Sequence, residues 1–228
     1  MAFLILIAFL MLLPITLFVL VPFGFALTSI GNLLTLPGQM LAVALDKQRR
    51  RNHALEHATV NVLEQQYRRR LPMGGFAEQD GFYIHGPAQP NAVLAAAREG
   101  LERLQRGETE LAVHPRCGTV LVAGQFISAI TFVLLLFLLK VSFPSVLLAM
   151  LLAILAARSL AQPVGLFLQR TLTISTDVHG MHVDRLDAEL PQQPLALMLS
   201  GGQPTHFRVW TQTIQVEAPA GPKRYKAY

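Results

Sequence analysis

Charged residues and cysteine are scarce in this sequence. Only 14% of its 228 residues are charged and 52% are hydrophobic, whereas about a quarter of the residues in a soluble globular domain are charged. This scarcity excludes an ordinary soluble domain and indicates a membrane protein. The single cysteine, Cys117, excludes an intramolecular disulfide bond and is typical of a reducing compartment.

Charge is absent from long stretches of the chain. Residues 2–45 contain no charged side chain, and residues 118–157 contain one, Lys140. A hydrocarbon core of about 30 Å needs about 20 helical residues, so residues 119–139 and roughly 143–160 are predicted to form a transmembrane hairpin with a tight turn. No chain of ionisable residues crosses these spans, so the sequence gives no support to metal transport.

The N-terminal apolar region allows more than one interpretation. It lacks the basic start and the small-residue cleavage site of a secretory signal, so we expect it to be retained. Its second half contains Pro22, Gly24, Gly31, Pro37 and Gly38. We interpret that half as either a second span or a re-entrant or interfacial helix.

Basic residues gather beside the apolar regions. Lys47 and Arg49 to Arg51 follow the first region directly, and Arg68 to Arg70 lie nearby. The positive-inside rule places residues 46–118 in the cytoplasm, and the hairpin returns residues 161–228 to the same side of a bacterial inner membrane. Arginines in these positions favour the lipid bilayer as partner and not nucleic acid. A membrane protein is a candidate further partner, and the oligomeric state is left open.

The expected fold class is a mainly α-helical membrane protein with three to four membrane segments. The expected regions are residues 1–45 (N-terminal membrane segments), 46–118 (cytoplasmic α+β region), 119–160 (transmembrane hairpin) and 161–228 (cytoplasmic interfacial helix and strand-rich tail). The two cytoplasmic pieces are too small to be stable alone, so we expect them to pack together.

Local patterns predict the elements of the two cytoplasmic regions. In the first, we predict a helix from Arg49 to about Tyr67 with Asn52 as its cap, a strand at GFYIHG, and a helix from near Pro90 to Gly107. In the second, QPVGLFLQRTLT is predicted to be an interfacial helix. The segments TISTD, MHVDRL and HFRVWTQTIQVE are predicted to be strands.

The segment NHALEHATVNVLE places His53, Glu56 and His57 on one face of the predicted helix. Two imidazoles at positions i and i+4 can hold one metal ion, and a neighbouring carboxylate can orient a water molecule or take its proton. The order His-x-x-Glu-His is that of the inverted zinc peptidases. The alternative is a polar helix face near lipid headgroups, with Glu56 favoured there by the helix dipole.

A second cluster, VHPRCGT, carries His114 and Cys117 at the entry of the hairpin. Imidazole nitrogen and thiolate sulfur are ligands that zinc prefers, so we expect zinc to be held by His53, His57 and Cys117, with or without His114. Four ligands would close the site, whereas three would leave a position for water. As alternatives, His114 caps the hairpin and Cys117 is simply a small buried residue.

The other candidate residues show weaker patterns. Glu64 lies about 10 Å along the helix axis from His57, so we predict a solvated or ion-paired carboxylate and not a shared ligand. His85, His179, His182 and His206 show no spacing that pairs them.

The quoted motifs resemble a known family. NHALEHATVNVLE, GFYIHG, GLERLQRGETELAVHPRCGT and PVGLFLQR, in this order, resemble a bacterial membrane-protein family known only as a domain of unknown function. The paired His-x-x-Glu-His and His-Pro-Arg-Cys-Gly-Thr motifs are also similar to the YqhQ-like membrane proteins. The resemblance extends over about residues 46–175. It implies a polytopic inner-membrane protein with a metal site on the cytoplasmic side, and it implies no reaction.

Two functions follow from these observations. One is a membrane-embedded zinc-dependent hydrolase, such as a peptidase, with Glu56 as the catalytic general base. Inverted zinc peptidases take a downstream glutamate as third ligand, whereas this chain offers histidine and cysteine. The other function is a non-enzymatic membrane scaffold that binds a partner and contains a closed, structural His/Cys zinc site, because no phosphate-binding glycine loop or similar substrate motif is present.

Overall fold

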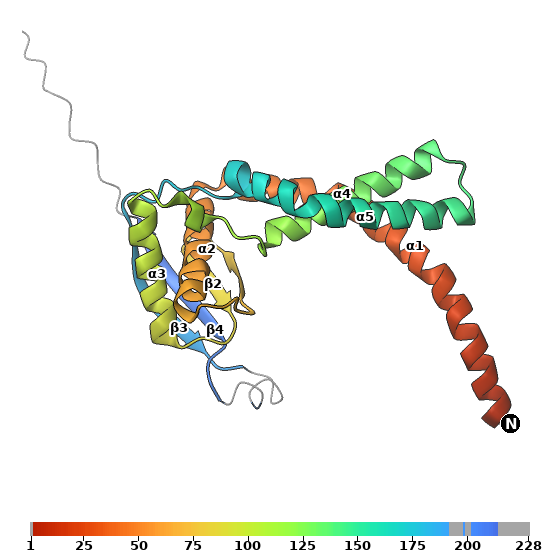
Figure 1. Ribbon diagram of the computed structural model, residues 1–228, viewed down its shortest axis with the longest axis horizontal. Helices are drawn as coiled ribbons and strands as arrows, with labels where there is room; N and C mark the ends of the chain where they lie inside the picture. The colour runs from red at the N-terminus through yellow and green to blue at the C-terminus, as the bar shows by residue number, and fades with distance from the viewer. Residues whose placement is uncertain (1, 192–197, 199–201, 214–228) are drawn as a thin grey trace, which may run out of the picture. The chain divides into compact units, whose positions relative to one another are not determined.

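The computed structural model describes residues 2–191, 198 and 202–213. These residues are mostly helical and include one small antiparallel sheet (Figure 1). They form two compact units. Unit 1 comprises Met1–Leu45 and Pro115–Thr173, and unit 2 comprises Asp46–His114 and Ile174–Tyr228.

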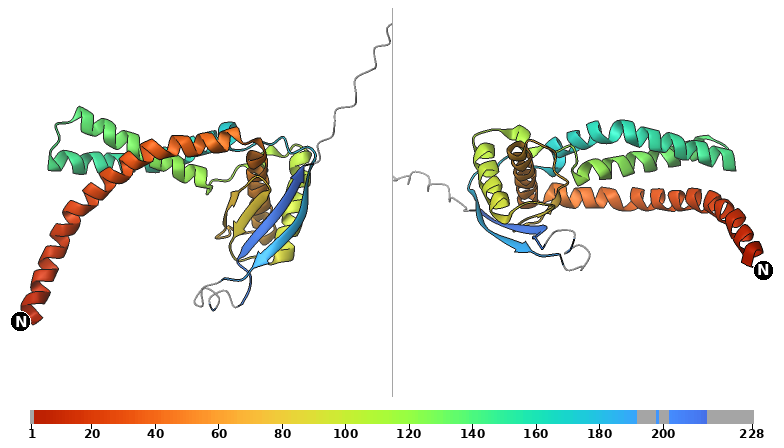
Figure 2. Two further views of the ribbon diagram at one scale, coloured as in Figure 1. Left: turned by 180° about the vertical axis from the view of Figure 1, so that it is seen from behind. Right: turned by 60° about the horizontal axis from the view of Figure 1, so that its bottom comes forward.

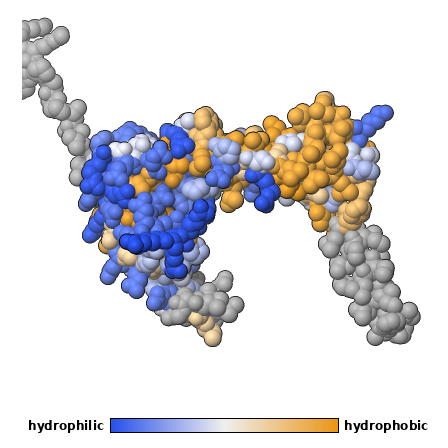
Figure 3. Space-filling model, viewed as in Figure 1, coloured by the Kyte–Doolittle hydropathy of each residue, from blue (hydrophilic) through white to orange (hydrophobic). Residues whose placement is uncertain are grey.

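Unit 1 consists of long apolar helices. They are α1 (Ala2–Leu45), α4 (Gly118–Leu138) and α5 (Phe143–Leu168), and a π-helical turn, η2 (Gln169–Thr173), continues α5. Among the described residues, three stretches are long and apolar enough to cross a membrane: Phe18–Leu45, Gly118–Leu138 and Phe143–Thr173. Figure 3 shows a largely hydrophobic surface over the hairpin of α4 and α5 and a largely hydrophilic surface over unit 2. The predicted fold class is confirmed to this extent.

The predicted hairpin is formed by α4 and α5. Its turn ends at Ser142, whose side chain accepts a hydrogen bond from the Ser145 amide, as expected of a capping box. The two helices approach closely at small residues. A Cβ atom added to Gly165 would lie 2.6 Å from Cα of Val120, so only glycine fits at this position.

Two predictions in unit 1 are corrected. The proline- and glycine-containing half of the N-terminal region is not a separate element, because α1 runs continuously to Leu45. The separate interfacial helix predicted from residue 162 is also wrong, because these residues extend α5 through Pro163. Long apolar helices tolerate a proline that would end a shorter, polar one.

Unit 2 is a sheet covered on one face by two helices. The helices are α2 (Lys47–Tyr67) and α3 (Pro90–Gln105); the strands are β1 (Gly74–Ala77), β2 (Gly81–His85), β3 (Met181–Glu189) and β4 (His206–Thr213), in the order β1-β2-β4-β3. All neighbouring strands are antiparallel. The pairing of β2 with β4 confirms that the two pieces of unit 2 pack together. The left view of Figure 2 shows the sheet from the side opposite the helices.

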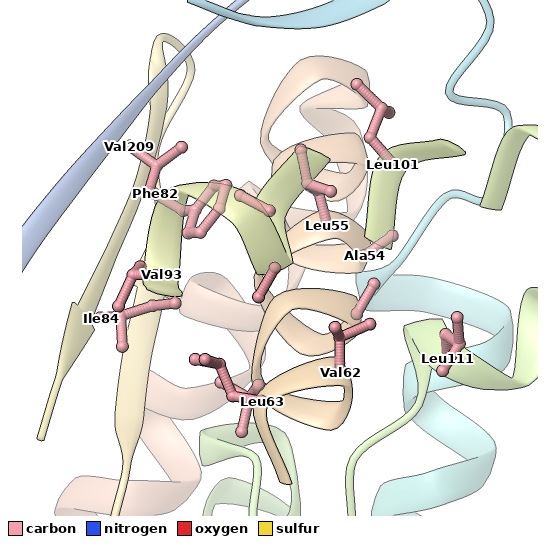
Figure 4. Packing of buried hydrophobic residues seen from close by; sticks show 14 of the residues in the cluster. Ala54, Leu55, Val62, Leu63, Phe82, Ile84, Val93, Leu101, Leu111 and Val209 are labelled. Atoms are coloured by element: carbon pink, nitrogen blue, oxygen red, sulfur yellow. The ribbon is translucent and has the colours of Figure 1, made fainter. Parts of the chain in front are cut away.

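The core of unit 2 lies between the helices and the sheet (Figure 4). Leu55 and Leu63 from α2 meet Phe82 and Ile84 from β2 and Val209 from β4, and all five are buried. Successive strand residues point to opposite faces, so Tyr83, His85, His206, Arg208 and Trp210 lie on the outer face of the sheet.

The N-terminus of α2 differs from the prediction. Asp46 is the N-cap, and its carboxylate accepts a hydrogen bond from the Arg49 amide at 2.9 Å. Asn52 is instead buried within the helix, where its amide donates to the carbonyl oxygens of Glu78 and Gln79. Its side-chain oxygen accepts from the Thr211 hydroxyl at 2.7 Å. Asn52 therefore joins the helix to the turn after β1 and to β4.

Two strand predictions also change. The segment TISTD is not a strand, because its backbone binds α2: the Ser175 amide donates to the Arg50 carbonyl, and the Arg50 guanidinium donates to the Ile174 carbonyl. The strand β1 was not predicted at all. The strand predicted from His206 is confirmed to Thr213, and its last residues lie outside the described part of the chain.

Candidate metal centre

Helix α2 presents His53 and His57 side by side, as the spacing predicted, whereas the neighbouring Glu56 lies against Gly75 of β1. The ring centroids of His53 and His57 are 4.4 Å apart. His57 and Glu56 are buried, with exposed fractions of 2% and 5%. A histidine pair and a carboxylate thus lie against the interior of unit 2 and not on a solvated helix face.

His57 is held in the orientation of a metal ligand. Its Nδ1 lies 2.6 Å from the carbonyl oxygen of Ala112. A carbonyl oxygen only accepts, so Nδ1 carries the proton and Nε2 has the free lone pair. Nε2 is buried and has no hydrogen-bond partner in the described part of the chain. A backbone carbonyl behind the ring is the usual support of a ligating histidine.

Burial also controls the protonation of His57. Desolvation, together with the neighbouring His53, holds the pKa of His57 well below its usual range, although the bond to Ala112 acts in the opposite direction. The imidazole is therefore neutral at neutral pH, which is the form that binds metal.

Glu56 is a buried carboxyl group that precedes His57 directly in the sequence. Burial raises the pKa of Glu56 to about 8, and its Oε2 atom has no hydrogen-bond partner among the described residues. A Cβ atom added to Gly75 of β1 would lie 2.7 Å from Oε1 of Glu56, so glycine lets this strand approach the carboxyl group. Buried polar atoms without partners are rare and concentrate at functional sites.

Side chains of α2 also fix the segment that leads to His114. Asn61 donates to the carbonyl oxygens of Leu111 and Val113, at 2.8 and 3.1 Å. With the bond from His57 to Ala112, three consecutive carbonyl groups at the end of the 3-10 helix η1 (Thr109–Ala112) are bound to α2. Asn61 was not predicted to support the site, although it lies on α2 four residues after His57.

His114 is buried close to the pair and contacts Glu64. Its ring centroid is 6.0 Å from that of His57, and its Nε2 atom is 3.8 Å from Oε2 of Glu64. Oε1 of Glu64 accepts the Leu71 amide at 2.8 Å. Glu64 thus pairs with His114 when that histidine is protonated, in agreement with the predicted ion-paired role.

Cys117 belongs to unit 1, where it begins the hairpin. Its sulfur accepts a hydrogen bond from the Thr119 amide at 3.3 Å, and it is the N-cap of α4. The residue that caps the hairpin is therefore Cys117 and not His114. The thiol is buried and forms no disulfide bond.

These observations define a protein with three membrane-length apolar helices and an α/β unit that contains a supported histidine pair. Residues 48–186 match the family described as "Domain of unknown function (DUF6391)", and the chain belongs to this family.

One relative is "Uncharacterized protein SYNPCC7002_A1392" of Picosynechococcus sp. (strain ATCC 27264 / PCC 7002 / PR-6). It is 38% identical over 79 residues, which are 31% of this chain and 38% of the relative. The chain thus covers less than half of that relative's length. No solved structure matches the chain. The likeness to YqhQ-like proteins stays a prediction.

Proposed function

We propose that this protein is a membrane-bound zinc-dependent hydrolase in which His53, His57 and Cys117 hold the ion. These three side chains offer two imidazole nitrogens and one sulfur, the donors that zinc prefers. The observation that carries the proposal is the geometry of His57. Its Nδ1 is bound to Ala112, and its buried Nε2 has no partner in the described part of the chain.

The sequence separation supports Cys117 as the third ligand. Cys117 follows His114 by three residues, a reach of about 10 Å for an extended backbone. The bonds from Asn61 and His57 to residues 111–113 fix the start of that segment beside the histidine pair. The connection between His114 and Cys117 is therefore short enough for the thiolate to join the imidazoles.

The surroundings of His114 favour three ligands over four. Its Nε2 lies towards Glu64, so we assign His114 to the support of the site. A three-ligand site keeps one position open, which is typical of catalytic zinc. Zinc held there would supply a Lewis acid that lowers the pKa of a water molecule. Burial raises the pKa of Glu56 to about 8 without metal, and the positive charge of bound zinc would favour its ionised form. Glu56 would then accept and return the proton.

We place this site on the cytoplasmic side of a bacterial inner membrane, because Lys47 and Arg49 to Arg51 follow the first apolar helix. An exposed residue of unit 2 such as Arg98 allows a direct test. Arg98→Cys should react with a membrane-impermeant maleimide in inverted vesicles and not in intact cells. Labelling in intact cells would reverse the assigned orientation.

Metal content and hydrolysis of a casein peptide mixture, measured on protein purified in detergent, test the proposal. His57→Ala should lose stoichiometric zinc, whereas the exposed His179→Ala should keep it. Glu56→Gln should keep zinc and reduce turnover by at least about 100-fold. Zinc content unaffected by His57→Ala would disprove the metal site. Turnover that is unaffected by Glu56→Gln would instead indicate the structural zinc site of a scaffold protein.

A further inference from the structure

The outer face of the sheet in unit 2 carries a row of metal-ligating residues. His85 of β2 is directly opposite His206 of β4, and His206 is directly opposite Glu189 of β3. Directly opposite residues share a face, with Cβ atoms about 4.5–5.5 Å apart. The row therefore crosses three neighbouring strands on the side visible in the left view of Figure 2.

The two histidines have the separation that a shared ion requires. Their ring centroids are 4.7 Å apart, close to the 4.4 Å between His53 and His57. Two imidazoles bound to one ion at about 2.0–2.1 Å have centroids roughly 4.5–5.5 Å apart. The observed distance lies in this range without any movement of the strands.

A second observation also indicates a ligand at this position. Nδ1 of His85 is buried and has no hydrogen-bond partner among the described residues. Phe76 of β1 stacks against the His85 ring at 5.9 Å and so restricts its rotation. On the other histidine, Nδ1 lies 3.0 Å from the Thr205 hydroxyl oxygen, which leaves Nε2 for a ligand. Both rings thus offer a nitrogen.

Other acidic residues near this face already have partners, which distinguishes them from Glu189. Arg208 binds Asp80 at 2.9 Å, and Asp187 accepts a hydrogen bond from the Trp210 indole at 2.6 Å. Glu189 is exposed at the end of β3, where its long side chain can turn towards His206. It is the carboxylate of this face that is next to the histidines in the register.

We propose that His85, His206 and Glu189 form a second site, for a divalent transition-metal ion. Two imidazoles and one carboxylate suit Zn²⁺, Fe²⁺ or Cu²⁺ and leave coordination positions open. The site shares no residue with the proposed hydrolase centre, so it does not depend on that function. It connects strands from both pieces of unit 2, so the metal should also stabilise this unit.

The experiment is a Zn²⁺ titration of the full chain in detergent, by calorimetry after removal of metal with EDTA. The wild type should bind one more equivalent than His206→Gln or His85→Gln, and Glu189→Gln should weaken that equivalent by about 10-fold. Because His206 is exposed, its substitution should leave the metal-free unfolding temperature unchanged. Cu²⁺ bound to the wild type should show hyperfine coupling to two imidazole nitrogens, and His206→Gln should abolish the two-nitrogen pattern.

His182→Gln is the matched control, because Nδ1 of His182 is also buried without a partner in the described part of the chain but lies opposite Gln212 and not a histidine. It should keep the wild-type number of equivalents. Equal numbers of equivalents in the wild type and His206→Gln would overturn the proposal. So would loss of one equivalent in His182→Gln, since binding would then not require the histidine pair.

Discussion

The two units bury their residues in different ways. In unit 1, the buried positions on α4 and α5 are mainly alanines and glycine, such as Ala123, Ala149 and Gly165. In unit 2, large side chains such as Phe82 and Phe207 fill the core. Lipid tails are as apolar as a leucine side chain, so helices in a membrane gain stability from close backbone packing, whereas a domain in water gains it from burial of apolar area.

The largest effect is expected when a core aromatic residue of unit 2 is removed. Phe82→Ala should lower the free energy of unfolding by about 3–5 kcal/mol, because it removes apolar burial and leaves a cavity. Urea unfolding followed by the fluorescence of the single tryptophan measures this, since Trp210 lies in β4, which pairs with β2.

A matched variant in unit 1 sharpens the comparison. Phe132 is as buried as Phe82 and packs against Phe25 with ring centroids 5.0 Å apart. Phe132→Ala should lower the free energy of unfolding by only about 1–2 kcal/mol. The side chain is in apolar surroundings both when packed and when exposed to lipid, so the variant loses mainly dispersion contacts. Equal costs for the two variants would contradict the assignment of unit 1 to a lipid environment.

The second effect concerns close packing in unit 1. Gly165→Leu should separate α4 from α5 at a cost of about 3 kcal/mol, because its Cβ would lie 2.6 Å from the Val120 backbone. Thermal unfolding in detergent, followed by helical circular dichroism, measures the loss. Gly118→Ala is the control, since nothing lies within 4 Å of its added Cβ. A loss of stability as large in this control would show that close approach is not the cause.

A smaller effect is expected from a polar anchor of unit 2. Asn52→Ala should lower stability by about 1–3 kcal/mol, because the carbonyl groups of Glu78 and Gln79 and the Thr211 hydroxyl lose their partner. Urea unfolding measures this loss. Gln66→Ala is a suitable comparison on the same helix, since the Gln66 amide donates to Glu99 at an exposed position. If both variants lower the free energy of unfolding equally, Asn52 is not an anchor of unit 2.

The features that could be predicted from the sequence depend on local pattern. The hairpin follows from uninterrupted apolar length, and the shared face of His53 and His57 follows from helical periodicity. The cap at Asp46 was missed because Asn52 is an equally good capping residue by type. Only the buried contacts of Asn52 with β4 and the turn after β1 exclude it as the cap.

The features that could not be predicted depend on residues far apart in the chain. His85 and His206 are 121 positions apart, and only the pairing of β2 with β4 brings them together. Asn61 and the carbonyl groups that it binds are likewise separated by about 50 residues. Periodicity within one segment contains no information on which segments pair. The sequence therefore predicted the candidate ligands of the first site but not the residues that support them, and it did not predict the second site.

The smallest expected effect concerns an exposed ion-pair cluster of unit 2. Hydrogen bonds from Lys47 and Arg51 lower the pKa of Asp177 to about 2. The stabilisation is therefore complete above the unfolded value near 3.8 and is lost as pH falls from about 4 to about 2. Asp177→Asn should reduce stability by less than about 1 kcal/mol at pH 7, because solvent screens the group.

This difference from the wild type should disappear towards pH 2 in urea unfolding. Asp184→Asn, which loses only a contact with the adjacent Arg185, should show no such trend, and a pH-independent difference for Asp177→Asn would exclude the ion pair as its origin.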